Sequence, residues 1–320
     1  MTMRPLLAFT LFSLLSTGVS AAWPEKPMRL VLPFPPGGGA DIMARPMAQK
    51  LSETLGQQVL IDNKGGAGGT VAAEFVAKAP ADGYTLFFAT VGTQAINVGL
   101  YPKLGYDPVR DFAPIALTHN APRILIVHPT VPAKSVAELI TYAKANPGKL
   151  SFASAGSGGT NHLSGELFKM MTGVDMVHVP YKGAGPAVAD VLAGRVQLTF
   201  DSIPVWIPHI KSGKVRALGV TSLQRSATVP DLPTISESGL KGFDVSNWLG
   251  VFAPANTSRD IVSRLNGELK KIMADTEIRR QLVEQGVEAM YTTPEGLAEL
   301  VRKDIEKWTK LVKLSGAKPD

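Results

Sequence analysis

The chain of 320 residues contains no cysteine, and this absence removes several kinds of chemistry. A chain without thiols has no disulfides, no thiolate metal site, no cysteine nucleophile and no lipid-modified N-terminal cysteine. Long apolar runs are also missing, because no stretch after Ala22 approaches the roughly 18 uncharged apolar residues that a membrane-spanning helix requires.

Charge is scarce and carries no pattern. Charged residues make up 19% of the chain and the formal net charge is +6, yet the longest basic cluster is the pair Lys270 and Lys271. A nucleic-acid-binding surface needs a basic stripe or patch, so nucleic acid is not a predicted partner. The small positive excess favours anionic ligands only weakly.

Nucleotide and metal motifs are missing as well. The run Gly66-Ala67-Gly68 is followed by Val71 where the dinucleotide fingerprint requires glycine, and no P-loop pattern occurs. The five histidines form no close ligand pair, and those at 119, 128 and 178 sit in or beside predicted strands, where a structural role is expected. The sequence therefore predicts no cofactor and no metal centre.

The N-terminal residues have the layout of a secretory signal peptide. Arg4 precedes an uncharged apolar run at 6–19, and Ser20-Ala21-Ala22 provides small residues for cleavage. The run is too short to span a membrane. We therefore expect residues 1–22 to be removed on export to a bacterial periplasm.

One pattern occurs four times: an apolar extended run, a glycine-rich turn and a helical run. Within each pair the glycine turns are 28 and 27 residues apart (Gly37 to Gly65, Gly156 to Gly183), the length of a βαβ step. Right-handed crossovers place both loops of a pair at the carboxyl edge of one sheet. The strands and their loops are residues 28–34 with 35–39, 58–63 with 64–69, 150–154 with 155–159, and 176–180 with 181–185.

These units predict an α/β fold with two lobes and a ligand cleft between them. The first lobe is expected to comprise 23–124 and 247–320, and the second 125–246, so the chain crosses twice, near Ile124 and Asn247. Further strands are predicted at 85–90, 124–128, 196–200, 217–221 and 250–253. Further helices are predicted at 135–146, 258–275, 276–284 and 294–312, with another at 205–210 interrupted by Pro208.

Glycine-rich loops at helix starts are candidate anion sites. The first turn of a helix presents unpaired N–H groups and about half a positive charge, which suits a carboxylate or a phosphate. Four side chains near these loops have two readings each. Asp41 either caps its helix or contacts a ligand, and His162 either caps or binds. Lys182 either pairs with a carboxylate or is solvated, and Asp201 ends a strand that could face the cleft.

An enzymatic alternative rests on Ala155-Gly156-Ser157-Gly158-Gly159. This run approximates the nucleophile elbow of α/β-hydrolases, with alanine in place of the first glycine. Ser157 would be the nucleophile of a secreted serine hydrolase. A triad needs an acid and then a histidine later in the chain, and neither His178 nor His209 sits in such a loop.

Several of these motifs resemble the Bug family, extracytoplasmic receptors related to tripartite tricarboxylate transporters. The resemblance covers nearly the whole chain after residue 22. It is carried by Pro33-Phe34-Pro35-Pro36-Gly37-Gly38-Gly39-Ala40-Asp41, Asn63-Lys64-Gly65-Gly66-Ala67-Gly68-Gly69, Asp82-Gly83-Tyr84-Thr85-Leu86, Asp111-Phe112-Ala113-Pro114-Ile115, Gly156-Ser157-Gly158-Gly159-Thr160-Asn161-His162-Leu163, Val179-Pro180-Tyr181-Lys182-Gly183-Ala184-Gly185-Pro186-Ala187 and Trp248-Leu249-Gly250-Val251-Phe252-Ala253-Pro254.

The resemblance implies a two-lobed Venus-flytrap binding protein without catalysis. The ligand would be a dicarboxylate, a tricarboxylate, an acidic amino acid or an aromatic acid, and the partners would be the membrane subunits of a transporter. We expect a monomer. In this family the first loop, here residues 34–41, holds a carboxylate partly through ordered water. The combined set of candidate binding residues is Phe34, Pro35, Gly37, Gly38, Ala40, Asp41, Gly66, Gly68, Ser157, Gly158, Thr160, His162, Tyr181, Lys182, Gly183 and Asp201.

Overall fold

The computed structural model describes residues 23–181 and 183–319. The expected signal peptide at 1–22 and the candidate Lys182 lie outside these ranges. No helix within the described ranges is long and apolar enough to cross a membrane.

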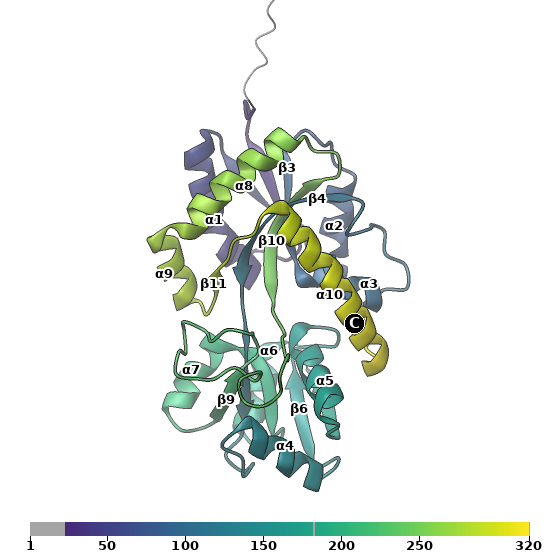
Figure 1. The fold of residues 1–320 in the computed structure, drawn as a ribbon, viewed down its shortest axis with the longest axis vertical. Coiled ribbons are helices and arrows are strands. Elements are labelled where there is room, and N and C mark those ends of the chain that lie inside the picture. Colours follow the sequence, from purple (N-terminus) through teal and green to yellow (C-terminus); the bar gives the residue numbers. More distant parts are fainter. Residues whose placement is uncertain (1–22, 182, 320) are drawn as a thin grey trace, which may run out of the picture.

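Two β-sheets divide the chain into two lobes, one above the other in Figure 1. The first lobe has a six-stranded sheet in the order β11-β4-β10-β3-β1-β2, and the second a five-stranded sheet in the order β7-β6-β8-β5-β9. The first sheet contains β1 (Met28–Leu32), β2 (Val59–Asn63), β3 (Thr85–Thr90), β4 (Phe112–Asn120), β10 (Trp248–Pro254) and β11 (Glu288–Ala289). The second contains β5 (Arg123–Val127), β6 (Leu150–Ser154), β7 (Met176–Pro180), β8 (Leu198–Ser202) and β9 (Arg216–Val220).

Helices surround both sheets, and the last three return to the first lobe (Figure 1). The long C-terminal helix α10 packs on β4 and also contacts α5 of the second lobe. The helices of the first lobe are α1 (Gly39–Leu55), the turns η1 (Ala67–Gly69) and η2 (Gly92–Ile96), α2 (Thr70–Ala77), α3 (Asn97–Leu100), α8 (Arg259–Ala274), α9 (Thr276–Glu284) and α10 (Pro294–Ser315). Those of the second are α4 (Val136–Ala145), α5 (Thr160–Thr172), α6 (Ala184–Leu192) and α7 (Ile203–Lys211).

Each lobe is built on a parallel three-stranded unit. In the first lobe β1 pairs in parallel with β2 and β3, and in the second β6 pairs in parallel with β7 and β8. The loops after these strands therefore meet at the carboxyl edge of each sheet. The predicted two-lobed α/β fold is confirmed.

The chain passes between the sheets twice, through two neighbouring segments. β4 ends at Asn120 in the first sheet and β5 begins at Arg123 in the second, while the return segment enters β10 at Trp248. The backbone N–H of Ala121 donates to the carbonyl of Asn247 at 3.1 Å, which joins the two crossing segments. The sequence predicts the first crossing near Ile124. In the structure it lies slightly earlier, between Asn120 and Arg123.

Two elements differ from the sequence-based expectation because of proline. The helix expected to be interrupted at Pro208 is instead continuous as α7 from Ile203 to Lys211. The strand β4, which contains Pro114, is absent from the prediction. Pro114 pairs with Phe252 beside a register shift, and bulges are among the few places where a sheet accepts proline.

Candidate functional site

A cleft of about 930 Å³ lies between the lobes and is lined by both. Apolar and polar side chains both form its wall, the polar ones including Asn97, Ser157 and Gln285. Such a mixture is usual for a site that holds a small molecule. Seven of the sequence-predicted residues line it: Phe34, Ala40, Gly68, Ser157, Gly158, Thr160 and Asp201.

Other predicted residues support the loops from outside the cleft lining. Within the described ranges these are Pro35, Gly37, Gly38, Asp41, Gly66, His162, Tyr181 and Gly183. Residues that line the cleft and that the prediction omits include Ile42, Asn97, Leu100, Arg123 and Val205.

The loop between β1 and α1 is held by the buried carboxylate of Asp41. One oxygen, Oδ2, accepts from the N–H of Gly37 at 3.0 Å and from Arg45 Nε at 2.8 Å, while Oδ1 accepts from Arg45 Nη2 at 2.9 Å. Hydrogen bonding by Arg45 lowers the pKa of Asp41, so the carboxylate is ionised at neutral pH. In the structure Asp41 therefore organises the loop, and its oxygens bond to protein groups.

The second loop of the first lobe is anchored by an amide that the prediction missed. Asn97 Nδ2 donates to the carbonyl of Gly68 at 3.1 Å, and both residues line the cleft. Gly68 has a φ of +61°, and a Cβ added to it would lie 2.8 Å from the Tyr101 hydroxyl oxygen. Glycine is thus required where the loop passes the Tyr101 side chain at the end of α3.

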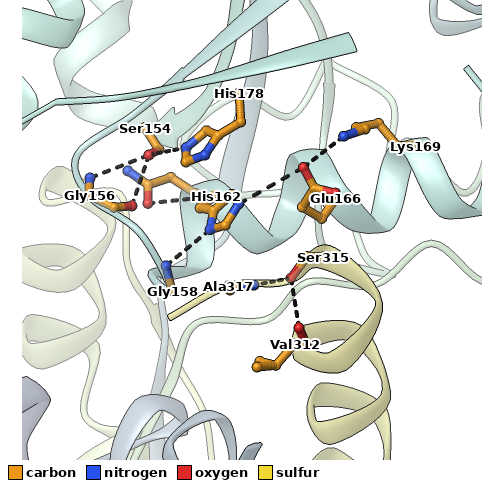
Figure 2. A network of polar contacts seen from close by, with 11 residues as sticks. Ser154, Gly156, Gly158, His162, Glu166, Lys169, His178, Val312, Ser315 and Ala317 are labelled. Carbon is orange, nitrogen blue, oxygen red and sulfur yellow. Dashed lines mark hydrogen bonds and ion pairs between the residues drawn. The ribbon is translucent and has the colours of Figure 1, made fainter. Parts of the chain in front are cut away.

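The first loop of the second lobe is held in place by two histidines (Figure 2). His162 Nδ1 accepts from the N–H of Gly158 at 3.0 Å, and His178 Nε2 lies 2.6 Å from Ser154 Oγ. The Ser154 hydroxyl also lies 2.8 Å from the carbonyl oxygen of Gly156 and donates to it. The loop from Gly156 to Gly158 is therefore fixed by side chains that do not line the cleft.

The two imidazole rings stack on each other with centroids 3.8 Å apart. Burial lowers the pKa of His162 to about 3 and that of His178 to about 4. Both rings are therefore neutral at pH 7, and a neutral Nδ1 is what allows His162 to accept from Gly158. Glu166 Oε1 lies 3.9 Å from His162 Nε2 and 3.0 Å from Lys169 Nζ.

Arg123, at the start of β5, is the one basic residue of the described cleft lining, and the prediction omits it. Its Nε and Nη2 donate to Thr160 Oγ1 at 3.2 and 2.9 Å, and both residues line the cleft. Burial lowers the pKa of Arg123 and the charge of Asp201 raises it, but an arginine remains protonated at neutral pH. The signal available in the sequence is a cation directly before the apolar run that begins at Ile124.

The remaining candidates of the second lobe have protein partners. The Tyr181 hydroxyl donates to Asp190 at 2.7 Å, and the N–H of Gly183 donates to the carbonyl of Ala155, so the two loops of this lobe are joined. Asp201 lines the cleft and accepts from Trp206 Nε1 at 3.0 Å.

The geometry does not assemble a serine triad around Ser157. Within the described residues the Ser157 hydroxyl makes no hydrogen bond, and the nearby histidines bond to Gly158 and Ser154 instead. Ser154 is only 1% exposed, so a substrate cannot reach it. Among residues 23–181 and 183–319, no three histidine or acidic side chains are grouped closely enough to hold a metal ion.

Comparison with known proteins gives a consistent family assignment. The model of the tripartite tricarboxylate transporter family receptor matches residues 43–317. Protein BugT of Bordetella pertussis is 35% identical over 99% of both chains. Among solved structures, R. palustris Rpa4515 with adipate is 40% identical, covers 93% of this chain and all of that one, and superposes with a TM-score of 0.77. MatC of Rhodopseudomonas palustris with bound malate is 36% identical over 91% of this chain and all of that one, with a TM-score of 0.72.

Proposed function

Because the chain belongs to the tripartite tricarboxylate transporter receptor family, which includes the Bug proteins, we propose that it captures a small carboxylate between its lobes and releases it unchanged. The candidate ligands are a dicarboxylate, a tricarboxylate, an acidic amino acid or an aromatic acid. The adipate and the malate held by two relatives support an organic acid.

The observation that carries the proposal is the meeting of helix starts from both lobes in one cleft. Helix α1 begins at Gly39 and α5 at Thr160, and both residues line the cleft. The N-cap residue of each helix is a glycine that makes no side-chain cap hydrogen bond. The N–H of His162 in α5 donates to Asn161 Oδ1 at 3.0 Å. The other first-turn N–H groups are available to an anion, which two helix dipoles would attract from opposite sides.

The same cleft suggests how binding proceeds. The two crossing segments at 121–122 and 246–247 are the only covalent links between the sheets within the described ranges, and they lie side by side. Such a pair is a suitable hinge for closure of two lobes around a ligand. We propose that a ligand closes the lobes by contacting loops of both.

The cellular setting is part of the proposal. The signal-like residues 1–22 support export to the periplasm, and the family assignment supports delivery of the ligand to the membrane subunits of a tripartite transporter. We propose that the receptor acts as a monomer without a cofactor or bound metal.

A thermal-shift screen against carboxylic acids tests the proposed function. A ligand present at 100 times its dissociation constant is expected to stabilise the folded protein by about 2.7 kcal/mol. The matched alcohols are expected to give no shift, because they carry no charge for the helix dipoles. A screen in which no acid raises the melting temperature would contradict the proposal.

The absence of turnover has its own test, which compares wild type with Ser157→Ala on activated esters. We expect both proteins to hydrolyse the esters at the uncatalysed rate. Enzymatic hydrolysis that disappears in Ser157→Ala would instead support a hydrolase.

A further inference from the structure

Resting on the proposed function, we propose that Arg123 selects the ligand, and that the ligand is an organic acid with one carboxylate on Arg123 and an apolar body beyond it. The candidate acids are thereby narrowed to those with an apolar body. Its basis is the side chains that line the cleft.

The Arg123 guanidinium has N–H donors that no described residue uses. Its Nε and Nη2 share a single acceptor, Thr160 Oγ1, and the described residues offer no partner to Nη1. The Nη1 atom retains some contact with solvent, unlike the fully buried side-chain atoms that lack a partner. A planar guanidinium held on one side and open on the other matches a carboxylate.

Two charged side chains of opposite sign line the cleft within the described ranges. Among the described lining residues Arg123 is the only basic side chain and Asp201 the only acidic one. In the β5–β8 pairing Asp201 lies opposite Ile124, while Arg123 lies opposite Ser202. Neighbouring residues of a strand point to opposite faces, so the two side chains leave different faces of the sheet. Both nevertheless line the cleft, and the charge of Asp201 acts on Arg123. Arg123 is therefore the group in the described cleft lining that suits a carboxylate.

The rim of the cleft is apolar on both lobes. Phe34 and Ile42 of the first lobe are 38% and 46% exposed, and Val205 of the second lobe is 39% exposed. These three side chains line the cleft, and ligand burial against them would remove apolar surface from water. A ligand with methylene or aromatic groups gains from this burial, whereas a short hydroxy acid does not.

Titration calorimetry with succinate, glutarate, adipate, malate and glutamate tests the ligand class. Affinity is expected to rise about fourfold with each methylene group from succinate to adipate, which corresponds to burial of one methylene. Adipate is expected to bind at least tenfold more tightly than malate, and glutarate more tightly than glutamate. Malate or glutamate as the tightest ligand would overturn this part.

Three variants test the role of Arg123 with adipate as the probe. Arg123→Gln is expected to lower affinity about tenfold or more, because it removes charged hydrogen bonds. Arg123→Lys is expected to retain part of the affinity, since lysine keeps the positive charge but lacks the two parallel N–H donors of a guanidinium. The control Arg110→Gln replaces an exposed arginine outside the cleft lining and should bind as wild type.

The variant Thr160→Val tests whether the Thr160 hydroxyl positions Arg123 for the ligand. It removes the hydroxyl that orients Arg123, so it should weaken adipate binding in wild type and have little further effect in Arg123→Gln. A circular-dichroism melt of each variant checks that the fold is retained. Unchanged affinity in a folded Arg123→Gln protein would overturn the inference while leaving the carboxylate receptor intact. Failure of every acid to bind wild type would contradict the proposed function as well.

Discussion

Replacing Gly158 by alanine is expected to lower the affinity for a carboxylate ligand by about tenfold to a hundredfold. Gly158 belongs to the second lobe, yet a Cβ added to it would lie 2.8 Å from Cδ2 of Leu100 in the first lobe. Overpacking of this kind costs about 1–3 kcal/mol, which converts to that range of affinity. The added methyl group would keep the two walls of the cleft apart. Titration calorimetry with the strongest acid from the screen measures the loss.

Two further variants separate this clash from backbone strain. Gly173 has a φ of +70°, close to the +77° of Gly158, but a Cβ there meets nothing within 4 Å. Gly173→Ala therefore carries similar strain and should bind as wild type. Adding Leu100→Ala to Gly158→Ala removes the clash and should recover most of the affinity. If the double variant binds no better than Gly158→Ala, contact between the lobes at this point does not control binding.

The free energy of unfolding is expected to fall steeply as the pH is lowered from 6.5 toward 5. Burial lowers the pKa of His119 and His162 to about 3 and that of His178 to about 4. Between these values and the ordinary histidine pKa of about 6.5, the unfolded chain binds protons that the folded chain does not. Stability must then decrease with decreasing pH, by about 1.4 kcal/mol per pH unit for each histidine that stays neutral.

Urea unfolding at several pH values measures this slope in matched variants. His178→Gln keeps an amide that can bond to Ser154 and removes one titrating ring, so its slope should be shallower by about 1.4 kcal/mol per pH unit. Val177→Gln changes the neighbouring residue of β7, which is 50% exposed, and should retain the wild-type slope. Equal slopes in all three proteins would show that His178 is charged in the folded state at these pH values.

The repeated local pattern explains why the fold could be predicted from the sequence. Each strand, glycine-rich loop and helix start lies within about 25 consecutive residues, and right-handed crossovers then fix which sheet edge the loops share. Predicted strands such as Thr85–Thr90 and helices such as Thr276–Glu284 have the same bounds in the structure. The strand β4 was missed because Pro114 is acceptable only beside an irregularity that its partner β10 provides.

The candidate site was predicted less completely, because its decisive contacts join distant residues. Arg123 and Thr160 are 37 positions apart and meet only when β5 and α5 pack in the same lobe. Asp41 lies in the first turn of α1, where it is buried, and its carboxylate bonds to Arg45 and to the loop before the helix instead of facing the cleft. A loop sequence identifies where a ligand can bind, whereas the charge that selects it depends on tertiary packing.

The contact between His162 and His178 also depends on tertiary packing. His162 and His178 have no ligand spacing in the sequence, yet their rings stack with centroids 3.8 Å apart beside the loop at Gly158 (Figure 2). Their shared role is to hold that loop, through Gly158 and through Ser154. Helix α5 and strand β7 bring them together, and no local pattern of residues indicates that the two would meet.

The most direct test of carboxylate capture is titration calorimetry at pH 7 with a dicarboxylate and its dimethyl ester. Adipate is a suitable probe, or the strongest diacid from the screen if that differs. The ester keeps the length and the apolar body but removes both charges that the helix starts and Arg123 would bind. We predict that the diacid binds and that the diester binds at least a hundredfold more weakly. Equal affinity for the two would contradict the account.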